Sequence, residues 1–122
     1  MASSDFLNVD LGVLCDNLAS EVNKTYRHLP WALKNEAVSR LKRQIHELSQ
    51  EVLRAGRSQG VLATQKHLKE AIALTHECVP LMSLCLKKNL LSQELYDRWV
   101  KQLNGIDKHL LNWQKASGRS EG

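Results

Sequence analysis

Apolar residues recur at intervals of four or three in the last third of the chain. They are Leu95, Trp99, Leu103, Ile106, Leu110 and Trp113, with mainly charged and polar residues between them. Because an α-helix turns once every 3.6 residues, this spacing places all of these side chains on one face. The segment is therefore predicted to be a helix that packs one apolar side against antiparallel partner helices.

The same helical period runs through most of the chain and is interrupted at three places. Pro30 ends the first stretch, because a proline pushes the residue before it away from helical angles. The segment AGRSQG ends the second, with Gly56 expected as a left-handed cap, and Ser92 is expected to cap the last helix. The predicted helices cover about residues 5–28, 31–55, 61–88 and 92–115, followed by a frayed tail at 116–122.

Four helices of similar length with short connections are typical of an all-α, antiparallel, up-down-up-down four-helix bundle. The chain has 122 residues, which fits one domain covering residues 1–122. Pro80 lies inside the third predicted helix, where it removes an N–H donor and crowds the carbonyl of His76. A bend is therefore predicted at about residues 76–80.

The third predicted helix carries two apolar stripes. The first is Leu68, Ile72, Thr75, Val79, Met82 and Leu86. The second is Leu74, Cys78, Leu81 and Cys85. One stripe is enough to close a four-helix core, so the second indicates either a wide core-facing helix or a contact between subunits. The subunit hypothesis predicts a closed homo-oligomer. In a single chain outside that assembly, these four side chains would be partly exposed.

Charge is unevenly distributed along the sequence. Residues 1–23 contain four acidic residues and no Lys or Arg, whereas residues 24–122 contain 17 basic and nine acidic residues, a balance of +8. A basic body favours a polyanionic partner or an acidic neighbour. On the side of the second helix opposite its apolar stripe, and continuing into the third helix, lie Arg40, Arg43, Arg54, Arg57, Lys66 and Lys69.

Two interpretations of this basic stripe remain open. The arginines could follow the phosphates of a nucleic acid, without base stacking because no aromatic residues are interleaved with them. Alternatively, the stripe is a solvated helix face with Arg43 and Glu47 as an i, i+4 pair, or with its arginines paired to an acidic helix of a neighbour.

The sequence offers no constellation for catalysis or metal binding. No Glu-x-x-His pair, no His pair at i, i+4 and no GxxxxGK[ST] occurs. The letters GxSxG occur at residues 56–60 and 118–122, but in a predicted helix connection and a predicted tail, without the strand-to-helix context of a catalytic serine. The three cysteines, Cys15, Cys78 and Cys85, are predicted to be reduced and buried. We therefore expect no catalytic residues, no metal, no cofactor and no enzymatic activity. Without a long apolar run or a signal peptide, no membrane contact and a cytoplasmic location are expected.

The stretch LLSQELYDRWVKQLNGIDKHLLNW, residues 90–113, carries a family resemblance. Its Leu-Ser-x-Glu-x-Tyr start and its heptad-spaced apolar residues resemble the final helix of a bacterial four-helix-bundle family. That family includes the proteins encoded in intervening sequences of ribosomal RNA genes and the accessory variability determinant (Avd) of diversity-generating retroelements. The Leu29-Pro30 break and the AGRSQG turn resemble the Avd branch, and the likeness extends from about Tyr26 to Lys115.

The resemblance implies a homo-pentameric ring. For the Avd branch it also implies a basic surface that binds nucleic acid and an association with a reverse transcriptase. The candidates for that surface are the arginines of the basic stripe. The alternative function is a structural scaffold oligomer that binds no nucleic acid.

Overall fold

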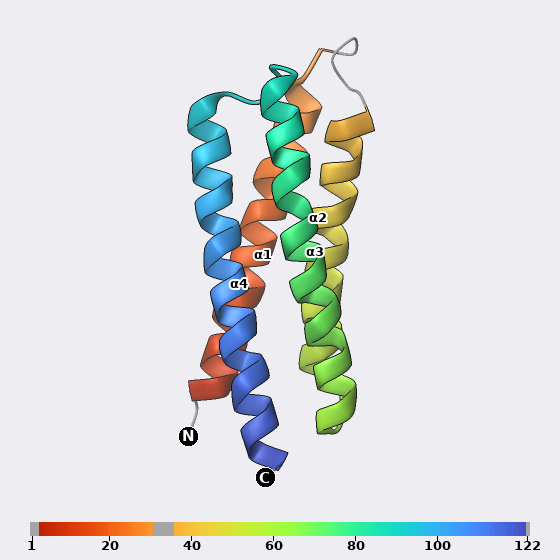
Figure 1. Ribbon diagram of the computed structural model, residues 1–122, viewed down its shortest axis with the longest axis vertical. Helices are drawn as coiled ribbons and strands as arrows, with labels where there is room; N and C mark the ends of the chain where they lie inside the picture. The colour runs from red at the N-terminus through yellow and green to blue at the C-terminus, as the bar shows by residue number, and fades with distance from the viewer. Residues whose placement is uncertain (1–2, 31–35, 122) are drawn as a thin grey trace.

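The computed structural model describes the backbone of residues 3–30 and 36–121 and the side chains of residues 11–30 and 36–118. This part of the chain forms four α-helices and contains no β-strand. They are α1 (Ser3–His28), α2 (Glu36–Arg57), α3 (Val61–Lys87) and α4 (Gln93–Glu121). The helices lie side by side along the long axis of the molecule, with both chain ends at the same end (Figure 1).

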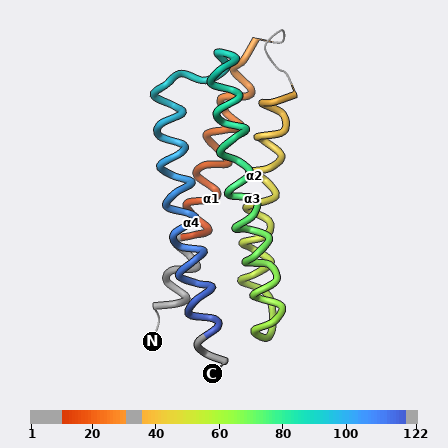
Figure 2. Tube along the Cα trace, in the orientation of Figure 1, coloured from red at the N-terminus to blue at the C-terminus, as the bar shows by residue number. Residues whose placement is uncertain are grey.

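Successive helices run in opposite directions and close into a four-cornered bundle. α1 packs against α2 and α4, and α3 packs against the same two helices. The α1–α4 edge of the bundle therefore lies opposite the α2–α3 edge, as the trace in Figure 2 also shows. The predicted all-α four-helix bundle is confirmed. None of the described helices is long and apolar enough to cross a membrane.

The core is one cluster to which all four helices contribute. Within the heptad stripe of α4, Trp99, Leu103, Ile106 and Leu110 are at most 1% exposed, and Leu95 and Trp113 pack at the edge of the cluster. The other helices face it with leucines and β-branched residues at helical spacing. These include Leu11, Leu18, Val22, Leu41, Ile45, Leu48, Val52, Leu68 and Met82. The apolar period of the sequence thus predicted the inner face of α4 correctly.

The α2–α3 connection differs from the prediction. α2 continues through Gly56 to Arg57, and the predicted start of this helix falls in residues 31–35, outside the described residues. The residue with positive φ is Gly60, at 93°, and not Gly56. Ser58 explains the longer helix, because its hydroxyl donates to the carbonyl of Arg54 at 2.7 Å and thereby extends the hydrogen bonding of the last turn.

α4 begins as predicted and extends further than predicted. The backbone N–H of Leu95 donates to Oγ of Ser92 at 3.1 Å, which confirms Ser92 as the cap. The helix continues to Glu121, beyond the expected end near residue 115. One contact that holds this end is the bond from Nε2 of Gln65 on α3 to the carbonyl of Gln114, at 2.9 Å. The segment after residue 115 contains no proline, so nothing in it breaks the helix.

α3 is one continuous helix through Pro80, which lies exposed on its outer side. The ring therefore projects away from the core packing of α3. The bend expected at residues 76–80 stays a prediction.

Candidate functional site

The residues of the predicted basic stripe, which we call the basic face, lie exposed on the outer sides of two neighbouring helices. All of its side chains are exposed, and they come from α2 and from the first turns of the neighbouring α3. Its members are Arg40, Arg43, Arg54, Arg57, Lys66 and Lys69. On α2 alone, the stretch from Arg40 to Arg57 covers about 25 Å of helix axis at 1.5 Å per residue.

The inner side of α2 explains why these arginines face outward. Leu41, Ile45, Leu48 and Val52 are all at most 5% exposed. They occupy one side of the helix at intervals of four and three residues, so the arginine stripe falls on the opposite side. Burial of the apolar side thus fixes the rotation of α2 and holds the basic face in solvent.

Arg54 is the one arginine of this face with a defined ion pair. Its Nη1 lies 3.0 Å from Oε1 of Glu51 and 3.9 Å from Oε1 of Glu47. The other oxygen of Glu51, Oε2, lies 2.9 Å from Nδ1 of His67, so the cluster joins α2 to α3. The ion pair expected between Arg43 and Glu47 is wrong within the described residues, because the Glu47 carboxylate faces Arg54 instead. The charge of Arg54 is therefore largely compensated.

The other five members of the basic face have uncompensated charge. Across the part of the chain that the structure describes, Arg40, Arg43, Arg57, Lys66 and Lys69 make no ion pair and no side-chain hydrogen bond. Exposed cations without an ion-pair contact keep their hydration, although Glu36, Asp16, Glu47 and Glu70 line the same grooves and reduce the local positive potential. These five residues are the ones available to an anionic partner.

The four side chains of the predicted subunit interface differ in their burial within the single chain. Cys78 and Cys85 are 0% exposed within the single chain, so the expectation that they would be partly exposed is wrong. Leu74 and Leu81 are half-buried and pack at the edge of the core. The fully buried line of α3 runs between the two predicted stripes and takes residues from both: Leu68, Ala71, Thr75, Cys78, Met82 and Cys85. The alternative of a wide core-facing helix therefore accounts for both cysteines.

A polar cluster that sequence reasoning missed joins α1 to α4. Oε1 of Glu21 accepts from Nη2 of Arg98 at 2.7 Å and from Nε1 of Trp99 at 3.2 Å. Oε2 of Glu21 accepts from Nε2 of Gln102 at 3.1 Å. The only signal in the sequence is that Arg98 and Gln102 are four residues apart and flank the core residue Trp99. Nothing in the sequence shows which acidic residue of α1 faces them.

These donors set the charge state of Glu21. Partial burial raises the pKa of its carboxyl group, but the hydrogen bonds from Gln102, Trp99 and Arg98 and the positive charge of Arg98 act against it. The result is a pKa below the ordinary value of 4.5. Oε1 of Gln102 is buried without a hydrogen-bond partner, because the amide group turns its nitrogen toward the carboxylate. The cluster therefore needs Glu21 to be ionised.

Replacing Glu21 should make the stability of the protein less dependent on pH. A depressed carboxyl pKa contributes stability that is present above the unfolded pKa and is lost as the pH falls through the folded pKa. We expect Glu21→Gln to lower the free energy of unfolding by about 1–2 kcal/mol near pH 7 and by progressively less below pH 4.5. Urea unfolding of both proteins between pH 2.5 and pH 7 measures this difference.

Glu77→Gln is the matched control, because Glu77 is exposed in the interior of α3 and makes no ion pair within the described part of the chain. It should change stability by less than about 0.5 kcal/mol at every pH. A Glu21→Gln effect of the same size at pH 3 and pH 7 would contradict the ionised cluster.

The described residues contain no group of three or more His, Cys, Asp or Glu side chains that could hold a metal ion. Comparisons with protein-family models, with curated proteins and with solved structures find no match to this chain.

Proposed function

We propose that this protein is a non-enzymatic nucleic-acid-binding protein whose basic face contacts the phosphate backbone. The observation that carries the proposal is the set of five exposed, unpaired cations at Arg40, Arg43, Arg57, Lys66 and Lys69. Cations on a surface of this kind displace the counterions that surround a nucleic acid, and this release drives binding.

The proposed contact recognises the negative charge of the phosphate backbone and not the identity of the bases. The described aromatic side chains lie on other parts of the bundle, with Tyr26 on α1 and with Tyr96, Trp99 and Trp113 on α4. The described helices α2 and α3 contain no aromatic residue that could alternate with the cations as a stacking platform, and Trp113 of α4 borders only the groove next to Arg57. Arginine guanidinium groups instead suit phosphate oxygens, because they donate in pairs. Binding should therefore depend weakly on sequence and strongly on salt.

The shape of the basic face supports contact with several phosphates at once. Its α2 part extends for about 25 Å, which corresponds to about seven nucleotide steps of a duplex at 3.4 Å per step. The helix is held by its buried side, so the cations are presented on a rigid support and lose little freedom on binding.

Assembly into a pentameric ring and association with a reverse transcriptase remain proposals that derive from the family resemblance. The binding proposal does not depend on either of them. A ring would present the same basic face several times and would raise the affinity for a long nucleic acid. The scaffold alternative is favoured by one observation, the pairing of Arg54 with Glu51, which compensates part of the face internally.

Charge reversal at two unpaired positions tests the proposal. The double variant Arg43→Glu, Arg57→Glu should bind labelled single- and double-stranded DNA and RNA at least about tenfold more weakly than the wild type at low salt. The control Lys101→Glu, Lys108→Glu makes the same change in net charge on the exposed side of α4 and should stay within about twofold. Fluorescence anisotropy at several salt concentrations gives both the affinity and the salt slope.

The salt slope is the change in the logarithm of the binding constant with the logarithm of the salt concentration. It separates direct binding to phosphates from attraction by the net charge of the protein. The face variant should have a slope for duplex DNA that is smaller by about 0.9 for each phosphate that it no longer neutralises, whereas the control should keep the wild-type slope. An equal weakening of binding in both variants would reject a defined basic face. Absence of wild-type binding at low salt would reject the nucleic-acid role and leave the scaffold.

A further inference from the structure

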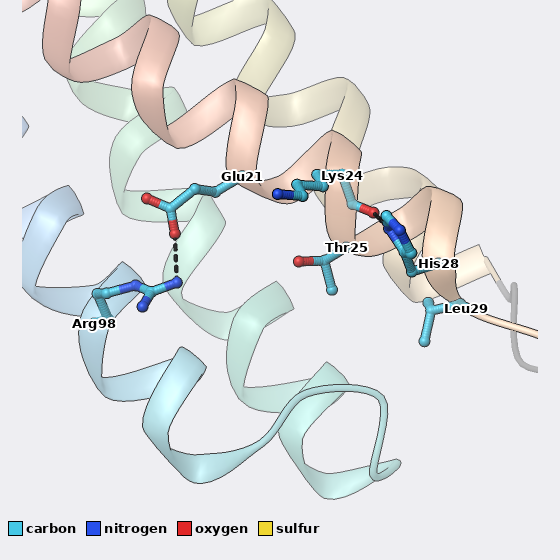
Figure 3. A pocket seen from close by; sticks show the side chains of 6 residues that line it. All are labelled: Glu21, Lys24, Thr25, His28, Leu29 and Arg98. Carbon is cyan, nitrogen blue, oxygen red and sulfur yellow. Dashed lines mark hydrogen bonds and ion pairs between the residues drawn. The ribbon is translucent and has the colours of Figure 1, made fainter.

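The α1–α4 edge, on the far side of the bundle from the basic face, contains a groove of about 510 Å³. Figure 3 shows the side chains that line it, which come from the last turns of α1 and from the first half of α4. They are Glu21, Lys24, Thr25, His28, Leu29 and Arg98. In this view the Lys24 ammonium and the Thr25 hydroxyl both point into the space between α1 and Arg98.

Glu21 and Arg98 form a prearranged part of the groove. The carboxylate of Glu21 already accepts hydrogen bonds from Arg98, Trp99 and Gln102, so its oxygens are occupied. One nitrogen of Arg98, Nη2, is fixed by the 2.7 Å bond to Glu21, and its remaining N–H groups have no partner among the described residues. The guanidinium is therefore held in place with donors to spare.

Two further donors in the groove are without a partner. The ammonium of Lys24 and the hydroxyl of Thr25 make no side-chain hydrogen bond or ion pair within the described ranges. His28 is fixed by a 2.7 Å bond to the carbonyl of Lys24. Because a carbonyl only accepts, Nδ1 of His28 carries the hydrogen and Nε2 is left free. Lys24, Thr25 and Arg98 thus present donors to the groove, whereas Nε2 of neutral His28 is an acceptor.

We propose that this groove binds a phosphate group. Arg98 and Lys24 supply charge-assisted hydrogen bonds, and Thr25 supplies a neutral one. A phosphate group fits this set because its oxygens accept hydrogen bonds. Lys24 adds a positive charge without an ion pair among the described residues, while Arg98, whose charge Glu21 compensates, contributes its remaining N–H donors. Leu29 forms an apolar margin at which a carbon group attached to the phosphate can lie.

The same cations also have a structural effect that must be separated from ligand binding. Basic residues in the last turn of a helix interact favourably with its free carbonyl groups, and α1 ends with Arg27 and His28. Arg27 is exposed and does not line the groove. It carries the same charge as Lys24 near the same helix end but lies outside the groove, which makes it the matched control.

Titration with inorganic phosphate, followed by the backbone amide signals of ¹⁵N-labelled protein, tests the site at fixed pH and with sodium chloride holding the ionic strength constant. Saturable shifts should be confined to amides near residues 24–29 and 98. Lys24→Gln should weaken phosphate binding about tenfold, and Arg27→Gln should change it by less than about twofold. Circular dichroism establishes that both variants are folded.

A second titration identifies the source of the phosphate group. An oligonucleotide without terminal phosphates offers only backbone phosphodiesters. Shifts at residues 24–29 and 98 with inorganic phosphate indicate a free phosphate or phosphomonoester, whereas shifts there with the oligonucleotide alone indicate a strand crossing the α1–α4 edge.

Two outcomes would overturn the phosphate site. One is the absence of saturable shifts with either probe, and the other is an equal effect of Lys24→Gln and Arg27→Gln. Neither outcome bears on the basic face, because its test uses variants on α2 and a control on α4.

Discussion

Leu103→Ala is expected to lower the free energy of unfolding by about 2–5 kcal/mol. Leu103 is 0% exposed and lies in the α4 stripe between Trp99 and Ile106, which are themselves at most 1% exposed. Truncation removes apolar contacts from the closed centre of the bundle and leaves a cavity that the rigid neighbours fill only in part. Urea unfolding followed by circular dichroism at 222 nm measures the change.

Leu111→Ala is the matched control for this substitution. It makes the same chemical change on the same helix, but Leu111 is 38% exposed. Water already reaches part of this side chain, so the destabilisation should be less than about 1 kcal/mol. Similar destabilisation by the two variants would mean that α4 does not bury the side that its heptad spacing predicts.

The fold was predictable because apolar residues recur regularly at helical spacing in α4 and α2. In α4 the intervals of four and three continue from Leu95 to Trp113, and only one side of a helix satisfies them. The same period in α2 placed the arginines opposite the core. The exposure of these arginines could be predicted from the sequence, because it depends only on the rotation of α2 about its own axis.

The buried side of α3 could not be predicted in the same way. Its two stripes border one wide apolar side, and the fully buried line passes between them through Ala71, Thr75 and Cys78. Which residues are central depends on how α2 and α4 approach α3 from its two sides, and that is a property of the whole bundle. The cysteines were therefore assigned to the wrong surface.

The polar contacts could not be predicted from the sequence for a different reason. Arg54 has acidic residues at several helical spacings, and its flexible side chain reaches Glu51 and Glu47 instead of leaving the latter to Arg43. The bond between Glu21 and Arg98 connects residues 77 positions apart. Such a contact depends on the register between α1 and α4, which the apolar period does not fix to a single residue.

The reactivity of the three thiols tests directly whether these side chains are buried in the core. Burial, and then the negative charge of Asp16, raises the pKa of Cys15 to about 12. Burial, and then the charge of Glu77, raises the pKa of Cys78 to about 12. Burial also raises the pKa of Cys85, although the charge of Lys88 acts against it. At pH 8, a thiol with a pKa near 12 has about a thousandfold less thiolate than one at the ordinary value of 9.0.

Cys15 and Cys78 are therefore expected to react with a disulfide reagent at least about a thousandfold more slowly in the folded protein than in guanidinium chloride, with the slower rate set by opening of the bundle. Cys85 is also expected to react more slowly in the folded protein than in guanidinium chloride, because it is buried as well. The measurement is the release of coloured thiolate from 5,5′-dithiobis(2-nitrobenzoate) at pH 8. The unfolded protein should release three equivalents at once, because the sequence contains three free cysteines.

A Ser20→Cys variant serves as the internal standard, since Ser20 is exposed on α1. It should add one fast equivalent while the three native thiols stay slow, which shows that the reagent is not limiting. The sharpest contrary outcome is the appearance of two fast equivalents in the wild type. Two fast thiols would match an outward-facing pair at Cys78 and Cys85, as the subunit-interface hypothesis required, and would mean that α3 is rotated relative to the core described above. Slow reaction of all three, together with the fast standard, leaves Leu74 and Leu81 as the members of that stripe still available to a second subunit.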